Sequence, residues 1–193
     1  DFTTTNFPGK EDALKVELRN IKKGDELFNG GTQLYNLALE HYLKANNFNS
    51  ENAELNYKIG ICFLYSSFKS KSIAYLEKAK SLNPAVSNKL SYYFGRAYHL
   101  QMQWDKAIQE YEAYGKLVAG TAEEKRSDAE KKIKECRNGI VLMQDTVRLR
   151  KLPDSLRYNI KNLGMELNSM YPDYRPVIAA DESEMYFTSR RDN

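Results

Sequence analysis

Residue sizes repeat along this chain at an interval of 35 residues, and this repeat constrains the fold more than any other feature. One copy runs from Ala53 to Pro84, and the next lies 35 residues later, with Gly95 in the place of Gly60. The matching positions are Ile59/Phe94, Gly60/Gly95, Phe63/Tyr98, Ser72/Ala107, Leu76/Tyr111, Ala79/Tyr114 and Pro84/Ala119. Small residues fall on small ones and large on large, except at Ala79/Tyr114. Self-similarity at this period predicts a solenoid of stacked helical units.

An earlier and looser copy precedes these two. Its matches to Gly60, Phe63, Ser72, Leu76 and Ala79 are Gly24, Leu27, Ala38, Tyr42 and Ala45. The register needs two extra residues, for which Gly30-Gly31 offers a natural turn. From Glu11 to about Val147 apolar residues recur at intervals of three and four, so we expect helices nearly throughout.

The order of a large residue, Gly, an aromatic, a small residue, a second aromatic, Ala and Pro resembles the tetratricopeptide (TPR) repeat. In physical terms, Gly on the first helix allows the second helix to approach closely, and the large residues fill the remaining gaps. Pro84 ends the second helix because proline cannot continue the hydrogen-bond ladder. The resemblance implies an all-α, TPR-type α-solenoid of about three helix pairs plus a capping helix, followed by a short C-terminal β-hairpin-like or extended tail.

In a TPR superhelix the first helix of each pair lines a concave groove, and the resemblance places groove positions around each repeat glycine. They are Tyr57, Ile61, Leu64 and Tyr65 in the second copy, Tyr92, Arg96, His99 and Leu100 in the third, and Ile21, Asp25, Phe28 and Asn29 in the first. We expect an amphipathic groove that takes an extended peptide or a helix of a partner protein. Tyr and Arg are the residues expected at such an interface. The alternative is that these aromatic side chains only pack against each other or the capping helix.

Thr121–Met143 predicts one further amphipathic helix. Its apolar face consists of Ala129, Ile133, Cys136, Ile140 and Met143. Thr121 followed by Glu124 fits a capping box, and the helix is expected to cover the open apolar end of the last repeat. Trp104, the only tryptophan, is expected to pack at the turn between two helices, with a ligand contact as the alternative.

The composition argues against several other functions. The net charge is only +3 and charges of both signs alternate along the helices, which indicates a solvated surface and no nucleic-acid partner. The two cysteines, Cys62 and Cys136, lack metal-ligand spacing and are expected to be buried thiols, with a disulfide as the alternative. We find no phosphate loop and no nucleophile motif, so we expect no enzyme activity and no cofactor or metal.

The sequence divides into three parts. Residues 1–10 are expected to form a loose leader, and residues 11–150 the helical-repeat domain with its capping helix. Leu152-Pro153-Asp154 interrupts the helical pattern, so residues 151–193 are expected to be a linker and the start of another domain. Within it, Tyr174–Ile178 and Met185–Thr188 predict short strands around a turn.

The tail resembles the opening of a WD-like β-propeller of Gram-negative envelope proteins. The matching residues are Leu163-Gly164, Leu167-Asn168-Ser169, Asp173-Tyr174, Pro176-Val177-Ile178, Ala180-Asp181 and Tyr186-Phe187-Thr188-Ser189-Arg190. About two strands are present, whereas a blade needs four, so the propeller itself is expected to lie outside these residues. The chain is accordingly expected to be an engineered piece or a proteolytic product.

TPR repeats followed by such a propeller resemble outer-membrane-associated proteins that carry a C-terminal OmpA-like domain, including a peptidoglycan-tethered component of the type IX secretion machinery. The resemblance implies a periplasmic lipoprotein whose TPR region docks a partner protein. Peptidoglycan would be bound only through the OmpA-like domain, which these residues do not include. The alternatives are a glycan-capture module or a structural spacer, and the sequence leaves the oligomeric state open.

Overall fold

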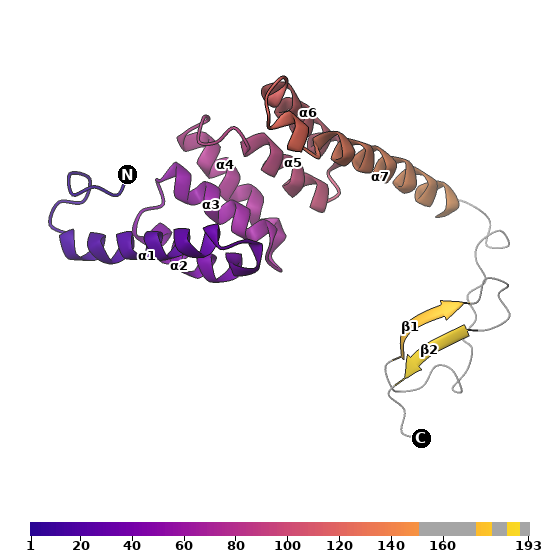
Figure 1. The fold of residues 1–193 in the computed structure, drawn as a ribbon, viewed down its shortest axis with the longest axis horizontal. Helices are drawn as coiled ribbons and strands as arrows, with labels where there is room; N and C mark the ends of the chain where they lie inside the picture. Colours follow the sequence, from indigo (N-terminus) through magenta and orange to yellow (C-terminus); the bar gives the residue numbers. More distant parts are fainter. Residues whose placement is uncertain (151–172, 179–184, 190–193) are drawn as a thin grey trace. The chain divides into compact units, whose positions relative to one another are not determined.

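The computed structural model describes residues 1–150, 173–178 and 185–189 (Figure 1). The chain forms two compact units, residues 1–145 and 146–193. The boundary falls five residues before the composition break near residue 150. The predicted motif residues at 163–169, 180–181 and 190 lie outside the described residues.

The first unit is a stack of three helix pairs followed by a single helix, as the repeat predicts. The helices are α1 (Glu11–Asn29), α2 (Tyr35–Phe48), α3 (Ala53–Leu64), α4 (Ser72–Leu82), α5 (Leu90–Leu100), α6 (Trp104–Val118) and α7 (Ala129–Arg150). Within a pair α1 packs on α2, α3 on α4 and α5 on α6, and the pairs join through α2 with α3 and α4 with α5 (Figure 1). Single 3-10 turns at Thr32–Leu34, Lys69–Lys71 and Glu124–Arg126 lie between the helices.

The repeat glycines allow each pair of helices to approach closely. A Cβ atom on Gly24 would lie 2.5 Å from the ring of Tyr42, and one on Gly95 would lie 2.7 Å from the ring of Tyr111. At Gly60 the equivalent contact is 2.8 Å to the side chain of Leu76. The glycine therefore faces the large residue of the second helix. The predicted role of the glycine is confirmed, and the contacting residue is the large one.

The small positions of the repeat are fully buried, beside a core that consists of three hydrophobic clusters. Ala38, Ser72 and Ala107 each have no exposed surface, and the large residues Tyr42, Leu76 and Tyr111 beside them are equally enclosed. Both cysteines, Cys62 and Cys136, are buried free thiols, as predicted.

Helix α7 begins at Ala129, eight residues later than the sequence predicts. The expected capping box does not form at Thr121, because its hydroxyl donates to the carbonyl of Val118 at 2.6 Å. Glu124 still accepts a backbone bond, from Gly120 N at 2.7 Å, but this closes a turn before the helix. Ser127 then accepts from Ala129 N at 3.2 Å and starts α7.

The first ten residues are not the loose leader expected from the sequence. Turn hydrogen bonds order them, including Phe7 N to Thr4 O at 3.3 Å. The ring of Phe7 lies 4.6 Å from that of Phe48 at the end of α2, and Phe2 stacks on Phe48 at 6.2 Å. Phe2 and Phe7 thus extend the core over the end of the first helix pair.

In the second unit, the two predicted strands pair as an antiparallel hairpin. Strand β1 spans Asp173–Ile178 and β2 spans Met185–Ser189. Tyr174 faces Thr188 and Val177 faces Tyr186, so two residues of β1 oppose one of β2. The second of these is Pro176, which has no N–H for the ladder, and a bulge at that place is the arrangement proline tolerates.

Candidate functional site

A row of aromatic side chains crosses the three helix pairs and ends on an arginine. Phe28 stacks on Tyr35 at a centroid distance of 4.6 Å, and Tyr35 meets the edge of Tyr65 at 5.1 Å. The guanidinium of Arg96 lies 4.9 Å from the centre of the Tyr65 ring, and its Nη1 donates to Tyr65 Oη at 2.7 Å. Three of these four residues were predicted, and we call the four the aromatic row.

Tyr35 is the member of the row that sequence reasoning missed. It is the first residue of α2, and the repeat register assigns groove positions only to the first helix of each pair. Burial raises the pKa of Tyr35 to about 12, so its hydroxyl remains protonated at neutral pH.

Arg96 carries a charge that no carboxylate of the described residues neutralises. It is half-buried, and among the described residues its hydrogen-bond partner is the hydroxyl of Tyr65. Among the ion pairs formed in the described parts of the chain, none includes Arg96. A partly desolvated guanidinium with free N–H groups is a strong site for a carboxylate, because it can bind both oxygens at once.

Lys58 shows the opposite arrangement at the first two helix pairs. Its ammonium contacts Asp25 Oδ1 at 2.8 Å and Glu54 Oε1 at 2.7 Å, and its side chain is only 19% exposed. Although burial opposes the charge, hydrogen bonds to these two carboxylates raise the pKa of Lys58. Asp25 also accepts from Tyr42 Oη at 2.6 Å. This cation is already satisfied by the protein itself.

A second group of tyrosines lies on α3 and α5. Tyr57 meets Tyr93 edge to face at 5.8 Å, and Tyr92 meets Tyr93 at 5.6 Å. The hydroxyl of Tyr57 donates to Ser87 Oγ at 2.9 Å, and that of Tyr92 donates to Asp128 Oδ1 at 2.8 Å. These rings pack on one another, as the alternative interpretation expected, while each keeps a partly exposed surface.

Two of the predicted groove residues belong to the core instead. Ile61 and Leu64 are each 2% exposed. Leu64 packs with Leu76, Leu90 and Phe94, because α5 lies directly against this side of α3. Neither buried side chain offers surface to a partner, and the cover of Leu64 includes α5, so the structure removes both from the predicted contact surface.

The remaining predicted positions differ in exposure. Leu100 is 46% exposed and Asn29 is exposed, whereas Ile21 and Phe28 are partly buried. His99 lies 5.4 Å from the ring of Trp104, and its burial lowers the pKa of the imidazole. The structure therefore places His99 in a packed aromatic contact.

Trp104 packs as predicted, but its contact is the capping helix. A Cβ atom on Gly139 of α7 would lie 3.0 Å from the indole. The indole Nε1 donates to Met143 Sδ at 3.3 Å.

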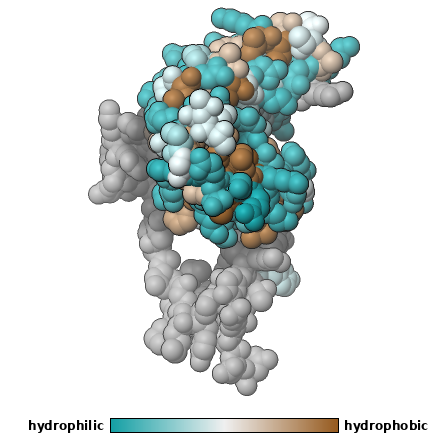
Figure 2. Space-filling view, turned by 90° about the vertical axis from the view of Figure 1, so that its left-hand side faces the viewer, coloured by the Kyte–Doolittle hydropathy of each residue, from teal (hydrophilic) through white to brown (hydrophobic). Residues whose placement is uncertain are grey.

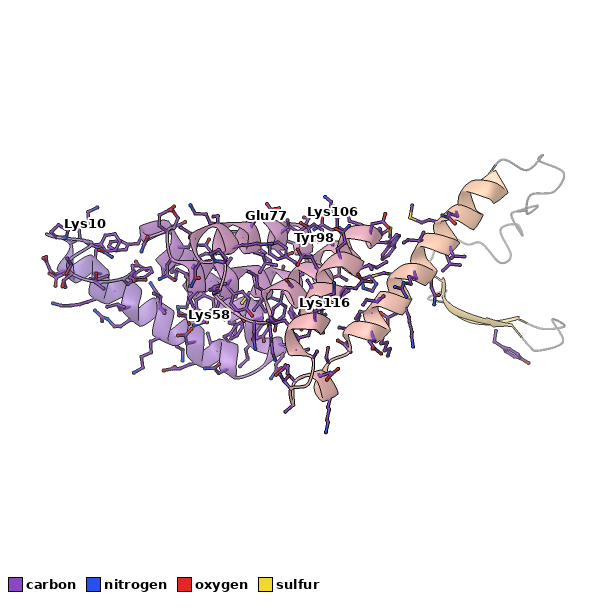
Figure 3. All side chains as sticks on the ribbon, turned by 90° about the horizontal axis from the view of Figure 1, so that it is seen from above. Lys10, Lys58, Glu77, Tyr98, Lys106 and Lys116 are labelled. Atoms are coloured by element: carbon purple, nitrogen blue, oxygen red, sulfur yellow. The ribbon has the colours of Figure 1, made fainter. Side chains whose placement is uncertain are left out.

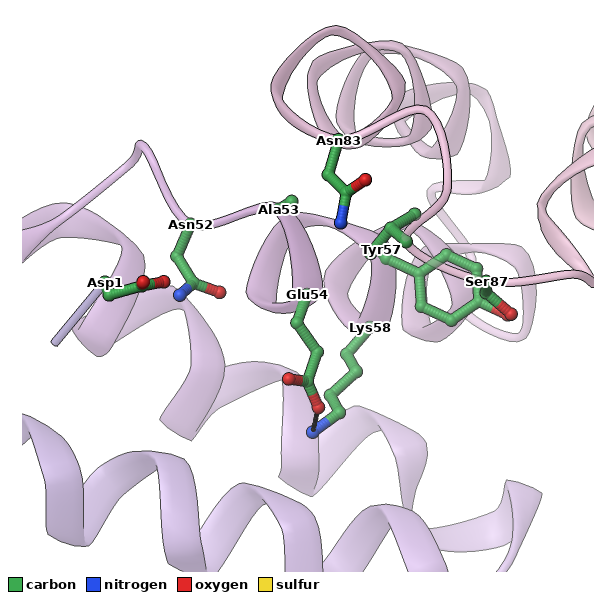
Figure 4. A pocket seen from close by; sticks show the side chains of 9 residues that line it. Asp1, Asn52, Ala53, Glu54, Tyr57, Lys58, Asn83 and Ser87 are labelled. Atoms are coloured by element: carbon green, nitrogen blue, oxygen red, sulfur yellow. Dashed lines mark hydrogen bonds and ion pairs between the residues drawn. The ribbon is translucent and has the colours of Figure 1, made fainter.

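A pocket of about 340 Å³ opens beside Tyr57 and Lys58, between the start of α3 and the α4–α5 connection (Figure 4). Asn52 Oδ1 accepts from Leu55 N at 2.8 Å, and Asn83 Oδ1 accepts from Ala85 N at 3.0 Å. These bonds fix the amide orientations, so the NH₂ groups remain as donors, and Figure 4 shows that of Asn83 directed toward Tyr57. A smaller hollow of about 110 Å³ adjoins it at Asp25 and Glu54.

The surface around these features is mixed in character. On the face drawn in Figure 2, hydrophobic residues form separate small patches among hydrophilic ones. In the view of Figure 3, Lys58 and the pair formed by Tyr98 and Lys106 lie toward opposite edges of the repeats. Lys106 Nζ is 5.4 Å from the centre of the Tyr98 ring.

Within the described residues, no group of His, Cys, Asp and Glu is placed to hold a metal ion. Among those same residues, no helix combines the length and apolarity needed to cross a membrane.

Comparisons with known proteins agree with the repeat geometry. No protein-family model matches the sequence, and no curated protein does. Solved structures do match. The crystal structure of MamA protein is 24% identical, with 72% of each chain covered and a TM-score of 0.56. The Arabidopsis OM64 TPR domain is 18% identical, with 64% of this chain and 96% of that one covered and a TM-score of 0.54. The fold is a TPR α-solenoid.

A third match bears on how such a fold can be used. The first TPR of Spaghetti (RPAP3), bound to the HSP90 peptide SRMEEVD, is 17% identical, with 66% of this chain and 94% of that one covered and a TM-score of 0.53. At these identities the likeness shows the fold alone. The present chain shares the architecture of these TPR domains.

Proposed function

We propose that the first unit is a non-enzymatic scaffold that docks an acidic segment of a partner protein along the aromatic row. The observation that carries this proposal is Arg96, whose half-buried charge has no carboxylate partner among the described residues. The rings of Tyr65 and Tyr35 beside it provide rigid apolar area at little entropic cost. A peptide carboxylate would complete the hydrogen bonding of Arg96 while neighbouring residues pack on the rings.

The opposite charge pattern at Lys58 supports the choice of an acidic partner. Asp25 and Glu54 already neutralise that ammonium, so the first two helix pairs offer no free cation there. An acidic segment is therefore expected to bind nearest the third pair. The TPR domain of RPAP3 is bound to a peptide that itself contains two Glu and one Asp, which makes this peptide a suitable probe.

The test is fluorescence anisotropy with labelled SRMEEVD and with SRMQQVN amidated at its C-terminus, a version of the peptide that contains no carboxylate. We expect the acidic peptide to bind more tightly, and Arg96→Gln to weaken it about tenfold or more. Arg19→Gln is the matched control, because Arg19 is exposed and lies on α1, outside the aromatic row. Equal binding of both peptides, or equal binding by Arg96→Gln and the unmodified chain, would contradict an anion-binding role.

We propose further that the scaffold works in the periplasm as part of an outer-membrane-associated assembly protein. The support is the resemblance of the tail to an envelope β-propeller, including the strings Asp173-Tyr174 and Tyr186-Phe187-Thr188. Pull-down from a Gram-negative envelope extract would test this, comparing the chain with its Tyr57→Ala/Tyr92→Ala/Arg96→Ala variant. If the chain and its variant retain a partner equally, the binding site lies outside the groove. Capture of cytoplasmic proteins alone would contradict the proposed location. A chain that binds neither peptide nor protein would be a spacer.

A further inference from the structure

Helix α7 makes a thin contact with the last repeat. Of its side chains from 129 to 144, only Ala129 and Cys136 are buried, within the cluster formed with Ala107 and Tyr111 of α6. Further along the helix, Val141, Leu142 and Met143 are 54%, 66% and 50% exposed. An amphipathic helix that leaves this much apolar surface open derives little stability from its docking.

The third repeat encloses polar atoms that lack partners among the described residues. The hydroxyl of Tyr111 and the amide nitrogen of Gln101 are buried, and neither forms a hydrogen bond with the described residues. The equivalent residue of the first repeat, Tyr42, donates to Asp25 at 2.6 Å. A buried donor without an acceptor favours any state in which water can reach it. The third repeat is therefore least satisfied where α7 covers it.

Among the described side chains, the polar attachments of α7 are at the surface and few. They are the bond from Tyr92 to Asp128 just before the helix, the bond from Trp104 to Met143, and the pair of Arg137 with Glu112. Exposed contacts of this kind stabilise little in water. One of them holds Tyr92, which is also a predicted groove residue.

We propose that α7 is a displaceable cap that opens away from α5 and α6 while the three helix pairs stay folded. Opening gives water access to Tyr111 and Cys136, and it releases Tyr92 from Asp128. If the proposed docking of a partner holds, the open state extends the groove at the third pair by Tyr92 and His99. The opening itself needs no partner, and this makes it testable independently.

The chain contains its own matched reporters, because Cys62 and Cys136 are both fully buried. Cys62 lies in the core between the first two pairs, and Cys136 lies on the buried face of α7 itself, against α6. We would measure the rate at which 5,5′-dithiobis(2-nitrobenzoate) labels each thiol in Cys62→Ala and Cys136→Ala variants of the full chain, without denaturant. We expect Cys136 to react at least about tenfold faster than Cys62, because local opening of α7 exposes Cys136 and leaves Cys62 buried. Equal rates would mean that both thiols are labelled only after global unfolding, and this result would overturn the proposal.

A second comparison separates cap opening from a general loss of stability. In the Cys62→Ala background, Tyr111→Phe removes the unpartnered hydroxyl and is expected to slow labelling of Cys136 by about fivefold or more. Tyr42→Phe alters the distant first repeat and is expected to leave that rate unchanged. Labelling that responds to Tyr42→Phe and ignores Tyr111→Phe would refute the cap. Since no peptide is present, this result is independent of whether SRMEEVD binds.

Discussion

Two tyrosines at equivalent repeat positions provide a sharp test of the packing argument. Tyr42 and Tyr111 each lie against a repeat glycine, and each is almost fully enclosed, at 0% and 1% exposure. Their hydroxyls differ: that of Tyr42 donates to the carboxylate of Asp25 at 2.6 Å, and that of Tyr111 has no partner among the described residues. Replacing each by Phe removes one oxygen atom and leaves the ring in place, so the pair isolates the value of the hydrogen bond.

We expect opposite signs for the two variants. A hydrogen bond to a charged group contributes about 1.5–3 kcal/mol, and Asp25 keeps Lys58 as a partner at 2.8 Å, so Tyr42→Phe should cost about 2 kcal/mol. Tyr111→Phe removes a buried group with no bond to lose and should stabilise by about 1 kcal/mol. For a unit of this size, these values correspond to a Tm about 4–8 °C lower and about 2–4 °C higher.

Urea unfolding followed by circular dichroism at 222 nm measures both free energies. The slope of the unfolding free energy with urea must be the same for both variants, because repeat proteins can lose cooperativity when one unit is weakened. If Tyr111→Phe costs as much as Tyr42→Phe, the Tyr111 hydroxyl has an acceptor after all. The conclusion that the third repeat buries an unpartnered hydroxyl would then be wrong.

Three further predictions use single residues with clear local geometry. Gly60→Ala should destabilise the fold by about 1–2 kcal/mol, because its Cβ would lie 2.8 Å from Leu76. Gly115→Ala, whose Cβ would have nothing within 4 Å, should stabilise it by about 0.5–1 kcal/mol. Urea unfolding measures both changes. Asn52→Ala should cost about 1 kcal/mol, since its side chain caps α3, and Asn52→Ser should restore most of it. Burial lowers the pKa of His99, so the unfolded chain binds a proton at this imidazole at a higher pH than the folded chain does. The free energy of unfolding should therefore fall as the pH drops below about 6.5, and His99→Gln should flatten that part of the pH profile.

The repeat could be predicted because it reflects contacts within one helix pair. Gly60 and Leu76 are 16 residues apart in sequence, and their contact requires one small and one large residue at fixed offsets, which the sequence displays directly. Tyr65 and Arg96 were placed by the resemblance to the TPR repeat, and in the structure the two side chains are in contact. Local spacing thus carried the fold, and the groove positions rested on the resemblance.

Contacts between successive pairs were less predictable. Ile61 and Leu64 were assigned to the groove by register, yet they are buried, because the distance from α3 to α5 depends on the side chains between the pairs. Phe2 and Phe7 had no periodic pattern, so their packing on Phe48 left no sequence signal. The sequence pattern places the start of α7 too early because the Thr121 hydroxyl has two possible partners. In the structure it donates to the carbonyl of Val118, and no capping box forms.

The residue that follows each repeat glycine shows how one geometry produces a directional surface. In the first pair this residue is Asp25, which is neutralised by Lys58 of the next pair. In the second it is Ile61, which is buried and contributes no charge. In the third it is Arg96, which reaches back to the hydroxyl of Tyr65 and meets no carboxylate in the described chain. The stack therefore presents its one unneutralised post-glycine charge at the third pair, next to the helix that we propose to open. A partner that is acidic at one end would accordingly be bound in a single direction, and reversing the order of residues in SRMEEVD should weaken its binding even though its composition is unchanged.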